Sequence, residues 1–319
     1  MAPGAPYAGV RGPRTPCREE REGVWGSPDP LSRPDRRDAP RLRAAGNEAV
    51  HSGLITRKFC LTCWMHAKDR SRLVFKLRYA ARHPDRIVPH ARRLARDAVL
   101  RVKHPDHVAY YRAVMKADAE RSAEAAVGGR THAEWLSVGQ MQFDYLVRHG
   151  LKPGMRMLEI GCGNLRAGRL FIDLLYPGDY YGLDISPDIL LAAQRTLSAE
   201  GLQGKLPHLT LVDDLTLKFL PSRYFDVVHA HSVFSHSPRH VIEECLAHVG
   251  RVMKPDGFFD FTFDRTEGAE HQVLHEDFYY RTETLIALAA RHGLAGEFMA
   301  DWEELPHAQS KLRVRPARV

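Results

Sequence analysis

The residues best suited to chemistry lie in one short stretch, in which two acidic residues flank a glycine loop. Glu159 lies in an apolar strand, and the loop Gly161-Cys162-Gly163 follows it directly. Asp184 closes a second apolar strand, 21 residues beyond Gly163. Glycines let a backbone approach a ligand closely, and a helix N-terminus offers unpaired N–H groups. An acidic residue at this interval can accept hydrogen bonds from a ribose diol. The stretch therefore predicts a nucleoside-binding βαβ unit.

Details of the loop distinguish between classes of nucleoside. A dinucleotide site would read GxGxxG around a pyrophosphate, and a phosphate loop would need Gly-Lys followed by Ser or Thr. Here Gly168 comes too late to be the third glycine, and Glu159 would repel a phosphate but suits an ammonium group. The loop favours a nucleoside with a cationic amino acid end. NAD binding, or a Rossmann unit that has lost its ligand, are the alternatives.

These residues resemble the cofactor loop of class I methyltransferases, whose E/D-x-G-x-G motif holds the amino acid end of S-adenosylmethionine (SAM). The resemblance extends from about Trp135 to the C-terminus and is strongest over residues 155–263. It implies an α/β fold with a doubly wound, seven-stranded, mostly parallel sheet whose last strand is antiparallel. The alternation of strands with helical connections independently predicts a parallel sheet. We expect the strands at residues 155–160, 180–185, 209–213, 225–231, 258–263, 297–302 and 311–315.

The resemblance also implies which residues contact SAM. In the family an acidic side chain after the third strand accepts a hydrogen bond from the adenine amino group, and the next backbone N–H serves a ring nitrogen. Asp214 lies 12 residues before Asp226, the family's usual interval, although a helix N-cap at Asp213 or Asp214 is a structural alternative. The predicted cofactor-binding residues are Glu159, Gly161, Cys162, Gly163, Asp184, Ile185, Asp214, Leu215, His231 and Gln142.

Two further patterns resemble a bacterial subgroup of the small-molecule or saccharide type. One is a GxxQFxxL helix that contains Gln142, and the other is the GCGxLRxGR wording of the loop. In that subgroup the helix is expected to cap the SAM pocket, with Trp135 sealing it. Arg166 and Arg169 stand at the start of the following helix, where positive charge is unfavourable to the helix dipole. Their placement favours a role in holding an anionic group.

Histidines lie in and just after the fourth expected strand. In the family the exit of this strand faces the methyl donor. His229, His231, His236 and His240 have a spacing that could suggest metal, but no carboxylate or cysteine completes the set, and we predict no metal. A histidine suits general base catalysis because its pKa lies near working pH. We therefore predict His236 or His231 as the catalytic base, with a structural role as the alternative.

The acceptor is expected to meet the segment after the fifth strand, residues 266–281, which is rich in His, Glu and Tyr. The resemblance implies that this region forms part of the acceptor pocket. The alternative is a polar loop that leads into a helix over residues 282–292. The predicted substrate-binding residues are His271, His275, Tyr279 and Tyr280.

Charge divides the 319 residues into unequal parts. Residues 1–103 carry a net charge of +13 and the remainder −6, within a total of +7. We predict a disordered Pro/Arg-rich tail (1–64), a basic helical extension (65–134) and a SAM-dependent methyltransferase domain (135–319). Within the extension, residues 65–103 are expected to form one or two amphipathic helices, the second over His90–Lys103, after Pro84 and Pro89 break the pattern. They would either pack as solvated helices or contact an anionic membrane or an acidic partner.

The tail contains two features with competing interpretations. Cys60 and Cys63 have the spacing of half a zinc site or a redox pair, but no second pair follows, and we expect a chance occurrence. Met65, where the helical pattern begins, is an alternative translation start. Five scattered cysteines form no disulfide framework, and no apolar stretch of 18 residues exists, so we expect a cytoplasmic protein. A peripheral location at the membrane is the alternative.

These observations predict a SAM-dependent methyltransferase that moves a methyl group to an oxygen or nitrogen of a small molecule or saccharide. An RNA or other nucleic-acid methyltransferase is the first alternative, and the acidic character of residues 104–319 disfavours nucleic acid as a partner. A non-catalytic SAM-binding protein is the second.

Overall fold

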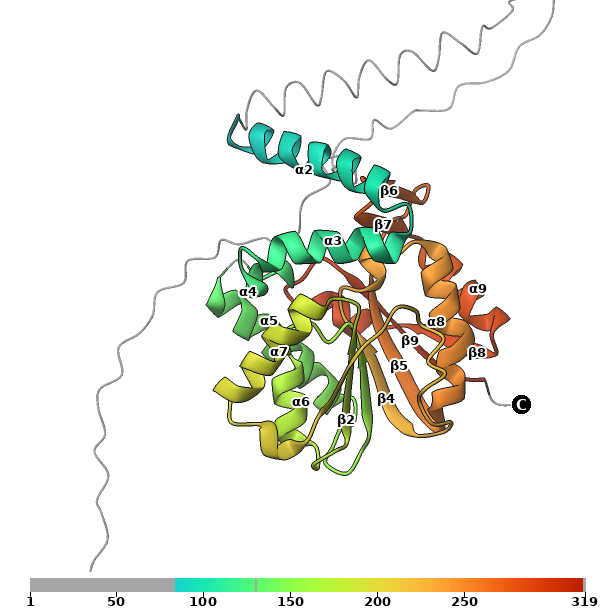
Figure 1. The fold of residues 1–319 in the computed structure, drawn as a ribbon. Helices are drawn as coiled ribbons and strands as arrows, with labels where there is room; N and C mark the ends of the chain where they lie inside the picture. The colour runs from blue at the N-terminus through green and yellow to red at the C-terminus, as the bar shows by residue number, and fades with distance from the viewer. Residues whose placement is uncertain (1–83, 130, 318–319) are drawn as a thin grey trace, which may run out of the picture.

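A computed structural model describes residues 84–129 and 131–317. Figure 1 shows a central sheet with helices on both faces and two N-terminal helices across one edge. In chain order the elements are α2 (Pro84–Lys103), α3 (His107–Ala119), α4 (Ala123–Ala126), α5 (His132–Arg148), β1 (Met157–Ile160), α6 (Gly168–Leu174), β2 (Tyr180–Asp184), α7 (Pro187–Ala199), η1 (Gln203–Lys205), β3 (His208–Leu211), β4 (Phe225–Ala230), η2 (Phe234–His236), α8 (Arg239–Val252), β5 (Met253–Arg265), β6 (His271–Val273), β7 (Asp277–Tyr280), α9 (Thr282–Arg291), β8 (Leu294–Phe298), η3 (Ala300–Glu304) and β9 (Ser310–Pro316).

Seven strands form the central sheet in the order β3-β2-β1-β4-β5-β9-β8. The first five in this order are parallel, and β9, the last strand of the chain, runs antiparallel between β5 and β8. The predicted doubly wound, mostly parallel fold is therefore confirmed. The hairpin of β6 and β7 adds to the carboxyl end of β5, where Asp264 pairs with Tyr279.

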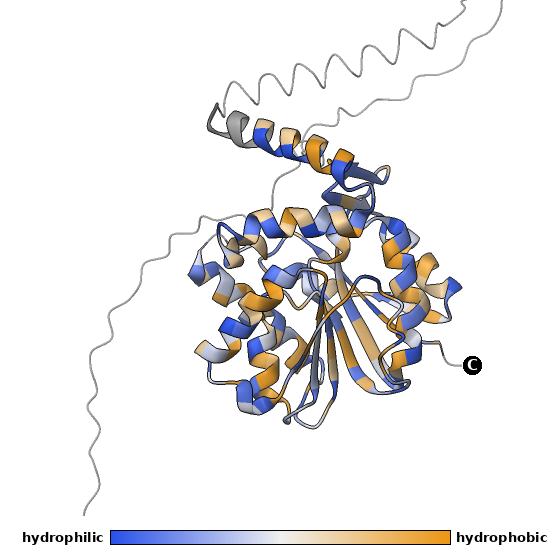
Figure 2. Ribbon diagram, viewed as in Figure 1, coloured by the Kyte–Doolittle hydropathy of each residue, from blue (hydrophilic) through white to orange (hydrophobic). Residues whose placement is uncertain are grey.

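Burial on both faces matches the mainly apolar sequences of β1 and β4. β1 is buried along its entire length and β4 nearly so, whereas the edge strand β3 is only partly covered. One apolar cluster lies under α8 and α9, with Ile242, Leu246 and Leu285 at its centre. A second lies under α5 and α6, around Leu146 and Phe171. Figure 2 shows the hydrophobic colour concentrated along the strands between these layers.

Three expected elements differ from the structure. Residues 266–281 are not a simple polar loop, because they contain the β6–β7 hairpin. The strand expected at 297–302 lies earlier, at Leu294–Phe298, and Trp302 belongs to η3 instead. The helix expected from His90 begins at Pro84, so Pro89 lies inside α2 rather than before it. The helix expected over 282–292 is confirmed as α9.

The predicted tail (1–64), with Cys60 and Cys63, lies outside the described residues. The described part of the basic extension consists of α2, α3 and α4, and α3 packs against α7 and α2. In this part of the chain, no helix is long and apolar enough to cross a membrane.

Candidate SAM site

The glycine loop leaves β1 in a conformation that only glycine adopts easily. Gly161 has φ +69° and Gly163 has φ +57°, both in the left-handed region. A Cβ atom at Gly161 would also overlap the side chain of Val233, which follows β4, and one at Gly163 would press on Val127. The loop is thus held by close backbone approach to two other segments. The space beside Gly161 is occupied by protein.

Asp184 ends β2 and fixes the loop to it. Its side chain accepts hydrogen bonds from the backbone N–H groups of Gly163 (2.9 Å) and Ser186 (2.8 Å), one on each oxygen. Asp184 is buried, and burial raises the pKa of its carboxyl group although the backbone donors oppose the shift. Each carboxylate oxygen retains a further lone pair. These acceptor oxygens therefore suit a ribose diol, whose hydroxyl groups would donate to them.

Glu159 is a buried carboxylate beside the same loop. It is 4% exposed and accepts a hydrogen bond from the hydroxyl of Tyr180. Burial raises the pKa of Glu159 to about 8, with Tyr180 and the positive charge of Arg166 acting in the opposite direction. A carboxylate in such a site ionises readily only beside a cation. Arg166 is such a cation in the structure, and the contact of Glu159 with an ammonium group stays a prediction.

The two subgroup patterns contact each other in the structure. Gly139 of α5 lies so close to the carbonyl of Arg166 that a Cβ atom would overlap it. The indole Nε1 of Trp135 donates to Asn164 Oδ1 at 2.9 Å, and the Arg166 guanidinium donates to the carbonyl of Val127. The glycine of one pattern and the arginine of the other are thus parts of one interface between α5 and the loop.

Gln142, the remaining cofactor contact predicted on α5, points toward the sheet. Its amide nitrogen donates to the carbonyl of Val138 at 3.2 Å, and its Oε1 lies 3.3 Å from His229 Nε2. Both groups are buried. The observed contacts give Gln142 a part in packing α5 on β4, and its contact with SAM stays a prediction.

The adenine end of the predicted site is already hydrogen-bonded internally. Asp214 Oδ1 accepts from the backbone N–H (2.9 Å) and hydroxyl (2.7 Å) of Thr216, and these bonds hold its pKa below the usual range. The N–H of Leu215, expected to serve a ring nitrogen, donates to Glu244 Oε2 at 2.8 Å. These bonds close a turn between Asp214 and Thr216, and the described residues between β3 and β4 contain no helix that Asp213 or Asp214 could cap. The adenine contacts stay a prediction.

Arg112 of α3 joins the ends of β2 and β3. This role was not predicted from the sequence. Its Nε donates to the carbonyl of Ile185 at 2.6 Å, and its Nη2 lies 2.6 Å from Asp213 Oδ1. In the predicted site the nucleoside lies between these two strand ends. α3 therefore lies across the cofactor position. A charged helix pattern far upstream carried no signal that could have placed it there.

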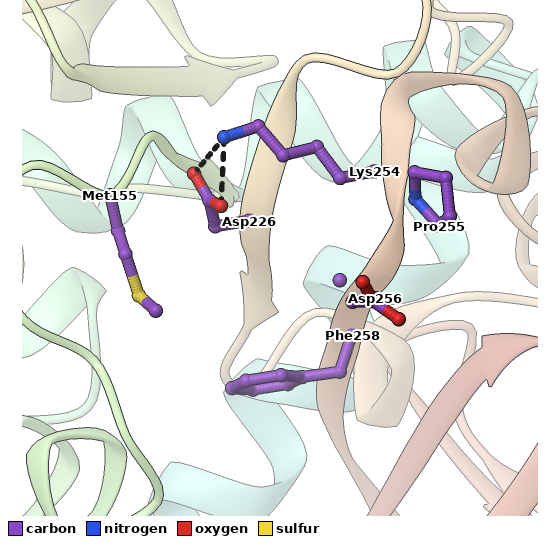
Figure 3. A pocket seen from close by; sticks show the side chains of 7 residues that line it. Met155, Asp226, Lys254, Pro255, Asp256 and Phe258 are labelled. Carbon is purple, nitrogen blue, oxygen red and sulfur yellow. Dashed lines mark hydrogen bonds and ion pairs between the residues drawn. The ribbon is translucent and has the colours of Figure 1, made fainter.

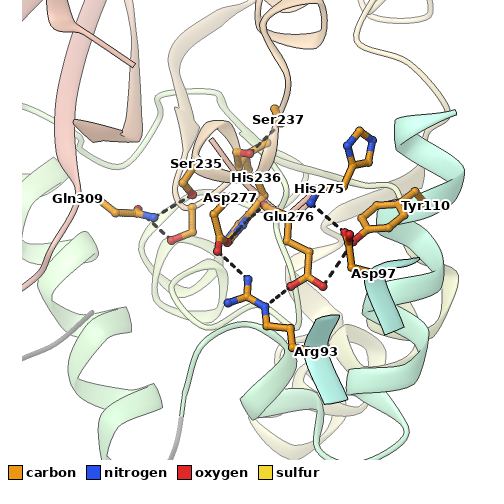
Figure 4. Close-up of polar contacts among 12 residues, drawn as sticks. Arg93, Asp97, Tyr110, Ser235, His236, Ser237, His275, Glu276, Asp277 and Gln309 are labelled. Atoms are coloured by element: carbon orange, nitrogen blue, oxygen red, sulfur yellow. Dashed lines mark hydrogen bonds and ion pairs between the residues drawn. The ribbon is translucent and has the colours of Figure 1, made fainter. Parts of the chain in front are cut away.

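His236 sits on η2, after β4, in a polar cluster that includes α2 (Figure 4). Its Nδ1 is 2.9 Å from the carbonyl of Glu276 and 3.3 Å from Asp277 Oδ1, and its ring stacks on Tyr111. Burial lowers the pKa of His236, but Asp277 and the Glu276 carbonyl raise it by more, so the net shift is upward. Asp277 is itself paired with Arg93 at 2.6 Å.

His231 has the opposite electrostatic character. Its ring lies 5.9 Å from that of Trp302 and 6.3 Å from that of His229, so the two imidazoles stack near each other at the carboxyl end of β4. Its Nδ1 is buried with no hydrogen-bond partner, and burial together with the positive charge of Arg166 lowers its pKa well below the usual value. His231 is therefore neutral at physiological pH.

The four predicted substrate residues lie on the hairpin but face different surroundings. Tyr280 is buried and donates to the carbonyl of Ser237 at 2.8 Å. His275 packs against the rings of Tyr110 (4.8 Å) and His107. His271 and Tyr279 stack on each other at 4.6 Å. The contact of these four residues with an acceptor stays a prediction.

A cavity of about 300 Å³ lies at the opposite end of the sheet, near the amino-terminal ends of β4 and β5, and is shown in Figure 3. It is lined by Met155, Asp226, Lys254 and residues 255–258. Asp226 binds the ammonium of Lys254 at 2.7 Å and accepts from the N–H of Arg156. These residues tie the amino-terminal ends of β4 and β5 together. This end is structural, because ligands of parallel α/β sheets bind at the carboxyl ends of the strands.

The chain is similar to known methyltransferases over part of its length. A family model described as a methyltransferase domain matches residues 158–259, from β1 to β5. A sterol 24-C-methyltransferase of Gibberella zeae is 32% identical over 111 residues, which cover 34% of this chain and 28% of that enzyme. An uncharacterized protein of Haemophilus influenzae is 24% identical over 172 residues, 54% of this chain and 63% of that protein. The chain thus spans less than two thirds of the length of these curated relatives.

Among solved structures, magnesium protoporphyrin IX methyltransferase of Synechocystis with bound SAM has a TM-score of 0.43 and 16% identity, over 56% of this chain and 78% of that one. The chain thus matches a methyltransferase domain over residues 158–259, which run from β1 into β5 of the parallel part of the sheet.

Proposed function

We propose that the protein is a SAM-dependent methyltransferase whose acceptor is a hydroxyl or amine of a small molecule or saccharide. The observation that carries the proposal is the buried pair of Glu159 and Asp184 on either side of the glycine loop. Glu159 suits the ammonium of an amino acid, and Asp184 suits a ribose. SAM presents both groups in one molecule, and when bound it supplies a methyl group that its sulfonium has already activated.

The chain contributes alignment, exclusion of water and a place for a proton. α3 lies across the ends of β2 and β3, and Val233 and Val127 pack on the loop glycines, so a ligand held between them would be shielded from solvent. A hydroxyl acceptor must lose its proton as its oxygen bonds to the methyl carbon and the carbon–sulfur bond breaks. His236 is the preferred base, because Asp277 raises its pKa and stabilises the imidazolium that would form.

His231 is the second candidate and has a different weakness. Its strongly lowered pKa makes it a poor proton acceptor, although its unpartnered Nδ1 is the kind of group that an acceptor could satisfy. An amine that enters neutral would need no base, and positioning alone would then suffice.

The charge distribution supports a small acceptor over nucleic acid. Residues 104–319 carry a net charge of −6, and a nucleic-acid-modifying enzyme usually carries positive charge around its site. The contact between the α5 and loop patterns supports the small-molecule or saccharide subgroup, because it gives the shared residues a common physical role.

The acceptor class is tested by incubating the full chain with methyl-labelled SAM and cell extract fractionated by size and polarity. We expect label in small polar material that is insensitive to ribonuclease and protease. Label in ribonuclease-sensitive material would replace the proposal with a nucleic-acid methyltransferase. SAM binding with no label in any fraction would identify a non-catalytic SAM-binding protein.

A further inference from the structure

α2 is amphipathic in a sense opposite to that of an ordinary surface helix. Its charged side faces the protein. Arg93 pairs with Glu276 (2.7 Å) and Asp277 (2.6 Å), and Arg96 pairs with Glu276 (2.9 Å) and Asp118 (2.7 Å). Figure 4 shows Arg93 reaching across to these carboxylates from α2. α2 is therefore attached to the domain by ion pairs rather than by an apolar face.

The apolar side of α2 faces solvent. Leu94, Val99 and Val102 are 45%, 52% and 85% exposed. They share a helix face with three exposed alanines, at positions 91, 95 and 98, as the helical period of 3.6 residues requires. We call these six residues the α2 stripe. The other large hydrophobic side chains found exposed in the described residues come one each from separate helices, strands or loops.

Cations border the α2 stripe on both sides. By helical position, Arg92 and Lys103 lie along one border and Arg101 along the other, and the side chains of all three residues are largely exposed. The one acidic residue among positions 91–103, Asp97, is buried toward the domain, where it accepts hydrogen bonds from Tyr110 and the His275 N–H. Arg101 makes only a long contact with it, at 3.9 Å. The outward face of α2 is thus apolar in the middle and positive at the margins.

We propose that the α2 stripe docks on an anionic lipid bilayer, parallel to its surface. Aliphatic side chains would enter the headgroup boundary, and the long Arg and Lys side chains would reach the lipid phosphates. Figure 1 shows α2 at the periphery of the molecule, where a flat surface can meet it.

Two other occupants are disfavoured by charge. A second copy stacked on the stripe would bring the Arg92, Arg101 and Lys103 side chains of both copies together. Residues 65–83 of this chain contain six Lys and Arg and one Asp, so they too would add positive charge to a positive margin. An anionic bilayer complements both the apolar centre and the cationic borders.

The test is sedimentation of the full chain with vesicles of phosphatidylcholine alone and of phosphatidylcholine with 30% phosphatidylglycerol, the composition being about that of a moderately anionic membrane. We expect binding to the anionic vesicles, weakened by salt and nearly absent on the neutral ones. Equal binding to both, or to neither, would overturn the proposal.

Variants separate α2 from the rest of the chain. Leu94→Ser with Val102→Ser should weaken binding at least about tenfold, and the charge variant Arg92→Gln, Arg101→Gln, Lys103→Gln on the order of a hundredfold. The matched control is Val147→Ser with Leu191→Ser, two exposed aliphatic residues on α5 and α7, which should bind like the wild type. Unchanged binding by the α2 variants would place the membrane contact elsewhere and contradict the proposal. So would a concentration-dependent dimer in light scattering that Val102→Ser abolishes.

Discussion

Glu159 is the residue of the predicted site whose ionisation depends most on a bound ligand. Its folded pKa of about 8 lies above its ordinary 4.5 because of burial. The unfolded chain is ionised between these pH values while the folded chain is not, so the ligand-free protein should lose stability as pH rises from about 5 to about 8. Glu159→Gln should abolish that part of the pH dependence, as measured by chemical unfolding across this range.

Binding of SAM should reverse this effect, because a nearby ammonium favours the ionised carboxylate. We expect about one proton to be released per SAM bound at pH 7. Calorimetry in two buffers of different ionisation enthalpy measures the released proton directly. Glu159→Gln should release none, and equal proton release by both proteins would show that Glu159 is not the group involved.

His236 and Asp277 form the second residue-scale test. Asp277 and the Glu276 carbonyl together raise the pKa of His236, and removing the carboxylate should lower it. NMR titration of the His236 ring should give a pKa above 6.5 in the wild type and a lower value in Asp277→Asn. An unchanged pKa would contradict the assigned ion pair. If His236 is the base, the acidic limb of the activity profile should shift in the same direction.

Individual residues differ in how far the sequence could predict them. Glu159, the loop glycines and Asp184 were predictable, because backbone conformation and burial at a strand end are local properties. The engaged N–H of Leu215 was not, since its partner Glu244 lies 29 positions away on α8. The contact between Val233 and Gly161 was likewise not predictable, because it joins segments that lie far apart in the chain. The space that a larger residue at 161 would fill is occupied by protein, so Gly161→Val should disrupt the loop itself as well as ligand binding.

At the scale of elements, strands and helices were predicted well where a periodic apolar pattern was long. The parallel core from β1 to β5 follows from buried apolar runs separated by helices. The β6–β7 hairpin was missed because its strands are only three and four residues long, and it joins the sheet through β7, which pairs with the end of β5. The positions of α2 and α3 rest on ion pairs between residues up to 184 positions apart, which no local pattern records.

Glu276 is the residue on which the attachment of α2 depends most. It is 5% exposed and binds both Arg93 and Arg96. Because the arginines are partly exposed, we expect Glu276→Gln to weaken the docking of α2 by about 1–3 kcal/mol. Hydrogen exchange should then accelerate in α2 but not in β1 or β4. Glu283→Gln, an exposed acid on α9, is the control. Equal protection of α2 in both variants would show that other contacts hold it.

At the scale of the whole molecule, the charge asymmetry of the sequence has a partial structural explanation. Arg93, Arg96 and Arg112 are basic residues of the N-terminal region that neutralise acidic groups of the domain. The predicted boundary at 134/135 remains a prediction. α3 nevertheless contacts the ends of β2 and β3, so it contributes to the same structural unit as the domain.

Truncation tests this organisation. A chain that starts at Met65 should keep the melting temperature and SAM affinity of the full protein, because residues 1–64 hold few apolar residues able to offset their ordering entropy. A chain that starts at Thr131 should melt lower and bind SAM more weakly, since it loses Arg112 and the packing of α3. Differential scanning calorimetry measures the two melting temperatures, and calorimetric titration measures the two SAM affinities. A marked loss of stability on removing residues 1–64 alone would contradict this division.

The central claim, that the chain binds SAM between the glycine loop and Asp184, is tested most directly by calorimetric titration of SAM into Asp184→Ala. Loss of charge-assisted hydrogen bonds to the ribose, each worth about 1.5–3 kcal/mol, predicts at least about a tenfold fall in affinity. Asp184 also fixes the N–H groups of Gly163 and Ser186, so thermal unfolding must show that the variant is folded. Asp256→Ala, at the opposite end of the sheet, should bind like the wild type. A folded Asp184→Ala protein that binds SAM as tightly as the wild type would contradict the account.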